Sequence, residues 1–446
     1  MVNPNEQNRF SYKPLKNTPF VSLFYILVIG TLLSVGGFGV WTVQKQMKEG
    51  LAAQLKLILA SNLESLRTWK KGTQLDAQVL ANQPEIRQKL ISLLKIAQPD
   101  STTPDFLRQT ADMIWLRKNL GEVCKKYGFV GFILFDPTGL QVGALLEEPV
   151  GKRDLLKKSD FFHRSLQGNT VISQPFPGEI DLPDENGKFQ SNWPTMFVST
   201  PISNDAGDIV GVLAFRLRPE KDFTRILSIS QFGETGESYA FNDQGVIVSN
   251  SRFDQQLVSI GLLQPKQNAI FNIQIRDPGR NLTVKKLRQK ENVSQWPFTV
   301  MANQALQHKG GIQVDGYNDY RGVPVVGAWT WFSDLDIGLT TEVDVAEAFR
   351  PVKTLMTWFL FLFGLLLFFG ATAFFMASRY SRSQQQTLEN EQRLSSFVNN
   401  SFDAILCIDI FGIIQSANPS VEIQFGFGPG ELSGKNVKML MPEPFH

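Results

Sequence analysis

The sequence contains few of the side chains that build metal centres, disulfide frameworks and hydrolytic active sites. Its 446 residues include two cysteines, Cys124 and Cys407, far apart in the chain, and three scattered histidines. Neither a zinc site nor a disulfide framework is predicted from so few cysteines. No Ser/His/Asp arrangement or paired catalytic carboxylate is present either, and we predict no enzyme active site within these residues.

An excess of charge of either sign is also missing. Lys and Arg number 44 and Asp and Glu number 42, which leaves a formal net charge of +2. No basic stripe with interleaved aromatic side chains occurs. The composition therefore gives no reason to expect a nucleic-acid partner.

Two long intervals contain no charged residue at all, one between Lys16 and Lys45 and one between Lys353 and Arg379. A helix of about 23 residues spans roughly 35 Å, which is enough to cross a bilayer. We predict membrane spans at 19–43 and 354–378, after a tail at 1–18. Neither span has an ionisable side chain, which argues against a transporter. The first span could be a cleaved signal peptide instead, but its apolar stretch is longer than usual and we expect a retained anchor.

Basic residues flank both spans and orient the chain. Arg9, Lys13 and Lys16 precede the first span, and Arg379 and Arg382 follow the second. The positive-inside rule then places both ends in the cytoplasm and 44–352 outside it, in a multi-pass inner (plasma) membrane protein surrounded by lipid. The signal is mixed, because Lys45, Lys48, Arg350 and Lys353 lie on the other side. Small residues four apart in each span, typical of packed membrane helices, lead us to expect a homodimer.

The segment between the spans alternates helical and strand patterns. Leucines recur at three- and four-residue steps from Leu51 to Leu66 and predict a long helix, with a break at Lys71–Gly72 or Gln83–Pro84. Hairpins with an Asx-x-x-Gly turn are predicted around Asp136 and Asn242, and a third follows around Asp409. Strand patterns also include 195–202, 209–217, 296–301 and 337–343.

This order of motifs resembles the double Cache sensor domain. The resemblance depends on SDFFHRSLQGN at 159–169, STPISNDAGDIVGVL at 199–213, GESYAFNDQG at 236–245 and DIGLTTEV at 336–343. It implies a distal unit at about 125–230 and a proximal unit at about 231–345. The expected fold class is α+β: a two-span membrane protein with an extracytoplasmic double Cache (PAS-like) domain on a long helix and a partial cytoplasmic PAS domain.

The resemblance also implies that the distal unit binds a small solute, between its sheet and the loops above it. Arg216 stands where amino-acid-binding members have Asp, and their Arg-x-Trp-aromatic pattern is missing here, so an α-amino acid is disfavoured. Two arginines would suit a carboxylate. The expected ligand-binding residues are Arg153, Asp160, Phe162, Trp193, Ser199 and Arg216. The alternative interpretation is surface arginines beside packed aromatic side chains.

The segment after the second span begins with a helical linker at 379–396. Residues 397–446 then closely resemble the first half of a PAS domain, through Asn418-Pro419, Gly426, Glu431-Leu432, Gly434 and Leu440-Met-Pro. A whole PAS domain is about twice as long, so we expect this chain to be a fragment of a longer protein. No cofactor is evident. The resemblance leaves haem open for a complete PAS domain, but nothing in these residues supports it.

Together these features predict a transmembrane signal-transduction receptor that relays the binding of a small extracytoplasmic solute to the cytoplasmic PAS domain and then to an output module. A histidine kinase is the expected output, and a diguanylate or adenylate cyclase is the alternative. An extracytoplasmic binding or adhesion module without signalling is an interpretation of a different class, which the PAS-like segment disfavours. A hydrolase is disfavoured by the missing catalytic residues.

Overall fold

The computed structural model describes residues 18–97, 103–153, 160–178, 180–183, 189–284 and 292–442. Most of the predicted tail, 1–17, lies outside them. The chain divides into two compact units, Met1–Leu355 and Met356–His446.

The first unit is organised around helix α1, Thr18–Asn82, which includes the first predicted span. Its 65 residues would extend about 100 Å at about 1.5 Å per residue. The predicted break at Gln83–Pro84 is confirmed, because α2 begins at Pro84, which has no backbone N–H to contribute to a continuing helix. No break occurs at Lys71–Gly72, where Gly72 is tolerated on an exposed turn.

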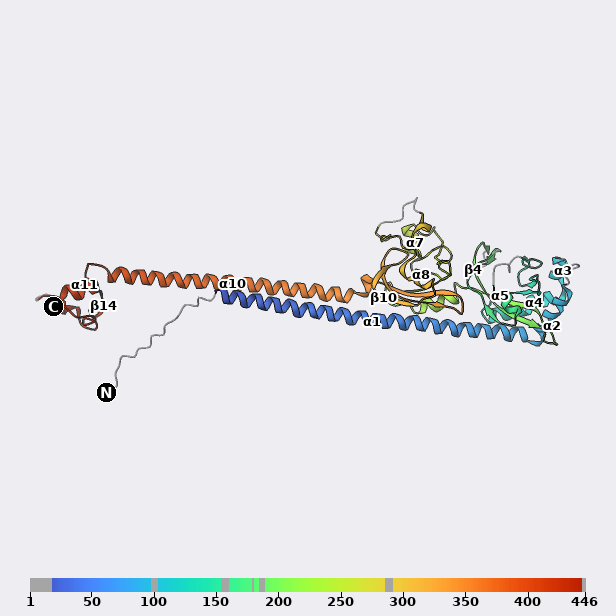
Figure 1. The fold of residues 1–446 in the computed structure, drawn as a ribbon, viewed down its shortest axis with the longest axis horizontal. Coiled ribbons are helices and arrows are strands. Elements are labelled where there is room, and N and C mark those ends of the chain that lie inside the picture. Colours follow the sequence, from blue (N-terminus) through green and yellow to red (C-terminus); the bar gives the residue numbers. More distant parts are fainter. Residues whose placement is uncertain are drawn as a thin grey trace, which may run out of the picture. The chain divides into compact units, whose positions relative to one another are not determined.

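Both α+β units pack on α1 (Figure 1). The predicted leucine stripe provides this contact: Leu55, Leu59 and Leu66 are buried. Asn62 falls in the same stripe, and neither its Oδ1 nor its Nδ2 has a hydrogen-bond partner in the described structure. The helix is therefore held by an apolar seam that contains one unsatisfied polar side chain.

The distal unit follows α1 in the chain. Its elements are α2 Pro84–Ile96, α3 Pro104–Gln109, α4 Ala111–Lys126, β1 Gly131–Phe135, β2 Gln141–Ala144, α5 Asp160–Leu166, β3 Val171–Ile172, β4 Phe176–Pro177, β5 Leu182–Pro183, β6 Phe189–Gln190, β7 Pro194–Ser203, β8 Ile209–Leu217 and α6 Phe223–Ile229. The antiparallel sheet has the order β2-β1-β8-β7-β3, and β4 pairs with β7. One face of the sheet packs on α1, α2 and α4, which leaves the other face for the loops and α5.

The proximal unit repeats the plan on the same helix. Its elements are β9 Glu237–Phe241, α7 Asp254–Ile260, the 3-10 helix η2 Val293–Gln295, α8 Val300–Ala305, β10 Gly311–Asn318, β11 Pro324–Phe332, β12 Ile337–Asp344 and α9 Val345–Ala348. The four-stranded sheet has the order β10-β11-β12-β9. The strand predicted at 296–301 is wrong: the Thr299 hydroxyl accepts a hydrogen bond from Ala302 N at 3.2 Å, and this N-cap starts α8 instead.

The predicted Asx-x-x-Gly turns are confirmed. Asp136 Oδ1 accepts hydrogen bonds from the backbone N–H groups of Thr138 and Leu140, and Gly139 has a φ of 87°. Asn242 and Asp409 cap their turns in the same way. The structure adds two more copies, at Asn204 and Asp319. One local device thus closes a turn five times in the described chain.

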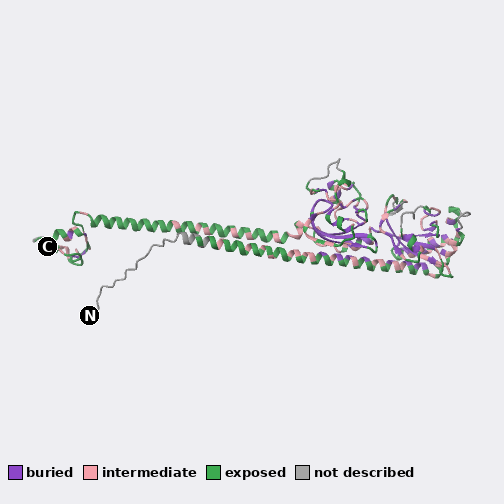
Figure 2. Ribbon diagram, viewed as in Figure 1, coloured by how far each residue is buried: buried purple, intermediate pink, exposed green. Residues whose placement is uncertain are grey.

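Helix α10, Arg350–Asn399, contains the second predicted span and the predicted linker. Figure 2 shows it mostly exposed, with a few intermediate residues, and none of its residues is buried in the described structure. The elements after it are β13 Leu406–Ile408, β14 Ile414–Ala417, α11 Pro419–Phe425 and the 3-10 helix η3 Val437–Leu440. Asn418, predicted as a PAS marker, is buried and binds the backbones of Ile405, Val398 and Asp403. These residues form a two-stranded sheet around a small core and not a closed five-stranded sheet.

Candidate functional site

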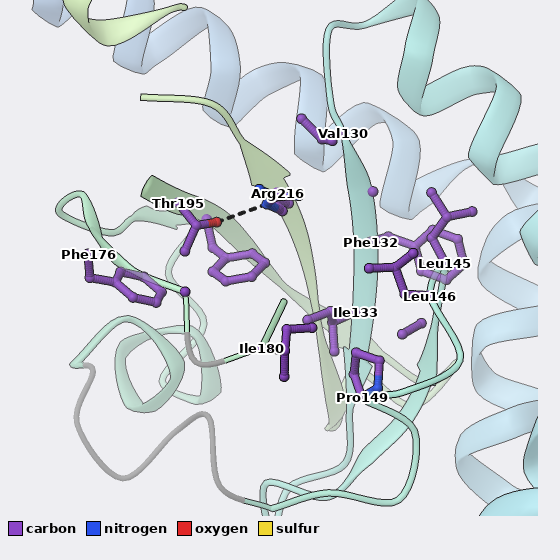
Figure 3. Close-up of a pocket in the computed structure, with 14 residues that line it drawn as sticks. Val130, Phe132, Ile133, Leu145, Leu146, Pro149, Phe176, Ile180, Thr195 and Arg216 are labelled. Carbon is purple, nitrogen blue, oxygen red and sulfur yellow. Dashed lines mark hydrogen bonds between the residues drawn. The ribbon is translucent and has the colours of Figure 1, made fainter. Parts of the chain in front are cut away.

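The distal unit has an apolar cavity on the face of its sheet that is turned away from α1. Strands β1, β7 and β8 form its floor, and the segments after β2 and β4 form its walls (Figure 3). Phe132, Ile133, Leu146, Phe176 and Phe197 are among the lining residues, and the cavity volume is about 60 Å³. Among the described lining residues, only Thr195 and Arg216 have polar side chains.

Arg216 is the charged group of this cavity and is only 6% exposed. Its position follows from strand register, because Arg216 on β8 lies opposite Gly131 on β1 and Phe197 on β7. Its Nε donates a hydrogen bond to Thr195 Oγ1 at 3.1 Å, whereas Nη2 has no partner in the described structure. Burial lowers the pKa of Arg216 to about 10, although Glu220 opposes this shift. A buried cation with a free donor is an incomplete anion site.

Trp193 and Glu220 lie behind the cavity. The indole Nε1 of Trp193 donates to Glu220 Oε1 at 3.1 Å, and the Trp193 carbonyl accepts from the N–H of Gly178, a lining residue. Burial raises the pKa of Glu220, and its Oε2 has no hydrogen-bond partner in the described chain. No ion pair within 4.0 Å joins it to Arg216 among the described residues, so the guanidinium keeps its donor available.

Two other predicted site residues are buried in the core beside the cavity. Phe162 packs edge-on against Phe135 with ring centroids 5.7 Å apart. Ser199, two residues from Phe197 on β7, forms a hydrogen bond at 2.7 Å with the hydroxyl of Ser165 on α5. Both residues therefore position α5 against the sheet, and neither lines the cavity.

The remaining two predicted site residues are exposed. Arg153 Nη1 donates to Thr138 Oγ1 at 2.9 Å, in the turn that follows β1. Arg216 is opposite Gly131, the first residue of the same strand. The two arginines therefore lie toward opposite ends of β1 and do not converge on one ligand. Asp160, at the start of α5, is 4.0 Å from Arg164.

Sequence reasoning missed most of the apolar walls. Pro149 and Ile180 come from loops, where no periodic pattern marks a buried side chain. Strand alternation could have identified Thr195, because it lies two positions before Phe197 on the same strand and therefore on the same face. Among the described residues, no group of three or more His, Cys, Asp or Glu side chains is arranged to hold a metal ion.

A second feature connects the distal and proximal α+β units to α10, the helix that contains the second span. Glu347 on α9 accepts hydrogen bonds from the backbone N–H groups of Glu234 and Thr235, each at 2.7 Å, and from the Thr235 hydroxyl at 2.5 Å. A Cβ at Gly233 would collide with the Glu347 carboxylate. Arg350, at the start of α10, also pairs with Glu234 at 3.0 Å. The connection between α6 and β9 is thus clamped to the start of α10.

Parts of the chain are similar to known proteins. The model of the PAS fold matches residues 392–446. Among solved structures, the chain is similar to the sensor domain of the Vibrio cholerae histidine kinase DctB, at 14% identity over 68% of this chain and 98% of that chain, with a TM-score of 0.40. It is also similar to the ligand-binding domain of the Campylobacter jejuni chemoreceptor Tlp3 in complex with L-valine, at 12% identity over 69% and 97% of the two chains and a TM-score of 0.37. A third similar structure is the ligand-binding domain of the Pseudomonas aeruginosa amino acid chemoreceptor PctB in complex with L-Arg, at 12% identity over 68% and 98% and a TM-score of 0.33.

Three features of the described structure define its architecture. Two α+β units with antiparallel sheets share one helix, and a PAS segment follows α10. Helices α1 and α10 are each long and apolar enough to cross a membrane, and none of their most apolar stretches is buried in the described structure. These features confirm the predicted α+β fold class, with two candidate membrane helices and a PAS segment at 392–446. By length and composition, its two apolar helices fit a membrane protein.

Proposed function

We propose that this chain is the sensory part of a transmembrane receptor whose distal unit binds a small solute carrying a carboxylate group. The observation that supports this most strongly is the buried guanidinium of Arg216, which faces an apolar cavity with one donor unpartnered. A carboxylate would supply both the missing acceptor and the counter-charge. Charge-assisted hydrogen bonds of this kind contribute about 1.5–3 kcal/mol each.

The walls of the cavity favour a particular kind of carboxylate. Phe176, Phe197 and Ile133 would contact an apolar tail, and no described lining residue offers a carboxylate for an ammonium group. We therefore favour a short aliphatic monocarboxylate over an α-amino acid. Two of the similar domains were solved with L-valine and L-Arg, so amino acids are the ligands against which the proposal is tested.

Ligand binding in this cavity would also contact its walls. Pro149 and Ile180 line the cavity from loops, so a bound solute would touch these loops as well as the sheet. A ligand that binds one arrangement of the walls more tightly than another shifts the population toward that arrangement.

The signal has a covalent and hydrogen-bonded route to the membrane. Glu220, beside Arg216, precedes α6, and α6 leads into the loop that Glu347 clamps. From there α9 continues into α10, the PAS segment and an output module, for which we expect a histidine kinase. Movement of the distal walls would therefore reach the start of the second span through a short series of contacts.

The binding proposal is tested on the full chain in lipid nanodiscs by isothermal titration calorimetry with propionate, butyrate, valine and arginine. Arg216→Gln should weaken carboxylate binding by about 10- to 100-fold, because one charge-assisted bond is lost. Arg153→Gln is the matched control, since this arginine is exposed and bonds only Thr138 in the described structure. Equal binding by wild type and Arg216→Gln would contradict the proposal, and so would preferred binding of the amino acids.

The orientation is tested with a membrane-impermeant maleimide, on chains that keep the native cysteines and carry one introduced cysteine each. Cysteines at the exposed positions Ser61 and Lys309 should react in intact cells. The native Cys407 is exposed and Cys124 is buried, so Cys407 provides the internal control and should react only after the cells are permeabilised. Reaction of Cys407 in intact cells, with Ser61 and Lys309 protected, would refute the proposed topology.

A further inference from the structure

The face of the proximal sheet that is turned away from α1 carries a polar cluster within its apolar core. Glu237, Tyr239, Tyr317, Tyr320 and Glu342 are all buried there. Glu237 on β9 and Glu342 on β12 are direct cross-strand partners. Two like charges opposite each other in a sheet are destabilising, and more so when both are buried.

Hydroxyl groups, and no cation, bind the Glu342 carboxyl group. Tyr317 donates to Oε1 at 2.7 Å and Tyr239 donates to Oε2 at 2.9 Å. A Cβ at Gly327 would collide with both the Tyr317 hydroxyl and the Glu342 side chain, so glycine at this position makes the arrangement possible. No Lys, Arg or His among the described residues forms an ion pair with Glu342.

Glu237 has a different set of donors. It accepts hydrogen bonds from the Ser251 hydroxyl at 2.6 Å, from the Arg252 backbone N–H at 2.7 Å and from the Tyr320 hydroxyl at 2.8 Å. The guanidinium of Arg252 bonds the carbonyls of Gly236 and Gly233 instead of this carboxylate. A backbone donor and two hydroxyls make Glu237 the better stabilised of the two cross-strand carboxylates.

The charges around Glu342 do not balance. Arg321 is the buried cation of the cluster, and it is already shared between Asp319 at 2.6 Å and Asp344 at 2.8 Å. The cluster thus holds four carboxyl groups, those of Glu237, Asp319, Glu342 and Asp344, and one buried guanidinium, which contacts Asp319 and Asp344. If all four were ionised, the cluster would carry three uncompensated negative charges. Glu342 has no backbone or cationic donor, so it is the group that most readily keeps a proton.

Electrostatics agrees with this assignment. The pKa of Glu342 is raised to about 8, chiefly by burial and also by the negative charges of Asp319 and Glu237, while the hydrogen bonds from Tyr317 and Tyr239 oppose the shift. Burial also raises the pKa values of Glu237, Asp319 and the three tyrosines, and the Arg321 guanidinium opposes this shift at Glu237 and Asp319.

We propose that the proximal unit is a second sensor whose stimulus is the proton, and that Glu342 is the group that binds it. At low pH the carboxyl group is neutral, and its O–H donates to one of the two tyrosine oxygens, whose own proton turns away. As pH rises, Glu342 releases the proton to water, and a second negative charge then faces Glu237 across the β9–β12 pair. Strand β12 leads through α9 into α10, so this repulsion acts on the segment that enters the second span.

The direction of the stability effect follows from linkage. The folded chain holds the Glu342 proton up to about pH 8, whereas an unfolded glutamate loses it near its ordinary pKa. Between those values the folded state binds more protons than the unfolded state, so stability falls as pH rises. One such group changes the unfolding equilibrium constant by up to about tenfold per pH unit.

The test uses the full chain in nanodiscs and follows two quantities between about pH 5 and pH 9. The first is the melting temperature, and the second is hydrogen exchange in 237–241 and 337–344, corrected for intrinsic rates. In wild type the melting temperature should fall and exchange should rise with pH. Glu342→Gln, which keeps the shape and removes the titration, should flatten this part of both profiles. Glu64→Gln, at an exposed site on α1, is the matched control and should leave them unchanged.

Two neighbouring variants test the direction of the effect independently of whether Glu342→Gln folds. Glu237→Gln removes the opposing charge. It should raise the melting temperature at all pH values and should move the midpoint of the Glu342 transition to lower pH. Tyr239→Phe removes a hydrogen bond to the charged form and should move the transition to higher pH. The proposal is overturned if Glu342→Gln keeps the wild-type profile, or if neither variant moves the midpoint in the stated direction. No solute in the distal cavity is needed for either result.

Discussion

Replacing Arg216 with methionine should stabilise the receptor while removing its carboxylate site. The two effects are expected together because we expect the buried guanidinium to bind the ligand while destabilising the folded state without it. Arg216 is 6% exposed, its Nη2 has no partner in the described structure, and apolar side chains surround it. Methionine has a similar length and would fill the same space without a charge.

The magnitude can be worked out from the pKa. Burial lowers the pKa of Arg216 to about 10. The ordinary pKa of arginine is about 12.5 or higher and each tenfold change is about 1.4 kcal/mol, so burial disfavours the charged form by about 3 kcal/mol. Two effects reduce this gain in stability: the lost hydrogen bond to Thr195 costs about 1 kcal/mol, and Glu220 loses the favourable charge of a nearby cation. We expect a net gain of about 1–2 kcal/mol, or a melting temperature higher by about 2–6 °C.

The assay is thermal unfolding of the full chain in nanodiscs, with and without butyrate. Wild type should gain melting temperature on adding butyrate, and Arg216→Met should start higher and gain nothing. The double variant Arg216→Met with Glu220→Gln removes the leftover carboxylate charge and should be at least as stable as the single variant. A melting temperature of Arg216→Met below that of wild type without ligand would refute the reasoning, because it would show that the guanidinium stabilises the fold.

The remaining predictions concern α1 and the clamp before the second span. Asn62→Leu should stabilise the chain by about 1–3 kcal/mol in urea unfolding, because it removes two unsatisfied polar atoms from the apolar seam; destabilisation would mean that they have partners. Leu66→Ala should cost about 2.5–5 kcal/mol by leaving a cavity in the same seam, whereas the exposed Leu57→Ala should change stability by less than about 0.5 kcal/mol. Glu347→Gln replaces one of the two acceptor oxygens and should lower the free energy of local opening at 233–235 by about 1–2 kcal/mol. Hydrogen exchange there should become about tenfold faster, and unchanged exchange would show that the clamp does not hold this loop.

Most of the elements were predictable because local chemistry determines them. The Asx-x-x-Gly turns depend on a side-chain oxygen and backbone N–H groups two and four residues away, so sequence spacing alone identifies them. The break at Gln83–Pro84 is equally local. The strand predicted at 296–301 failed because an apolar run with aromatic residues fits a strand or a short helix, and the Thr299 cap decided for the helix.

The candidate site was only partly predictable. Arg216 was expected to bind a ligand, and it does line the cavity, but its pairing with Arg153 would have required both side chains to reach one end of β1. Phe162 and Ser199 are buried beside the cavity and contact α5 or the sheet. The sequence did contain one unused signal: Glu237 begins the otherwise uncharged run Glu237–Phe241, and Glu342 follows the uncharged run 337–341. A charge in a predicted core strand indicates a site worth examining.

The amino-acid sequence by itself determined the two uncharged spans, the leucine stripe of α1 and the three predicted turns, because each depends on residues within a few positions of one another. Only the tertiary structure decided which charges are buried and which face each other. Glu237 lies opposite Glu342, and Arg216 lies between Gly131 and Phe197, through strand pairing across long stretches of chain. Such register is set by the packing of whole sheets on α1, and a shift of one residue would turn every one of these side chains to the other face.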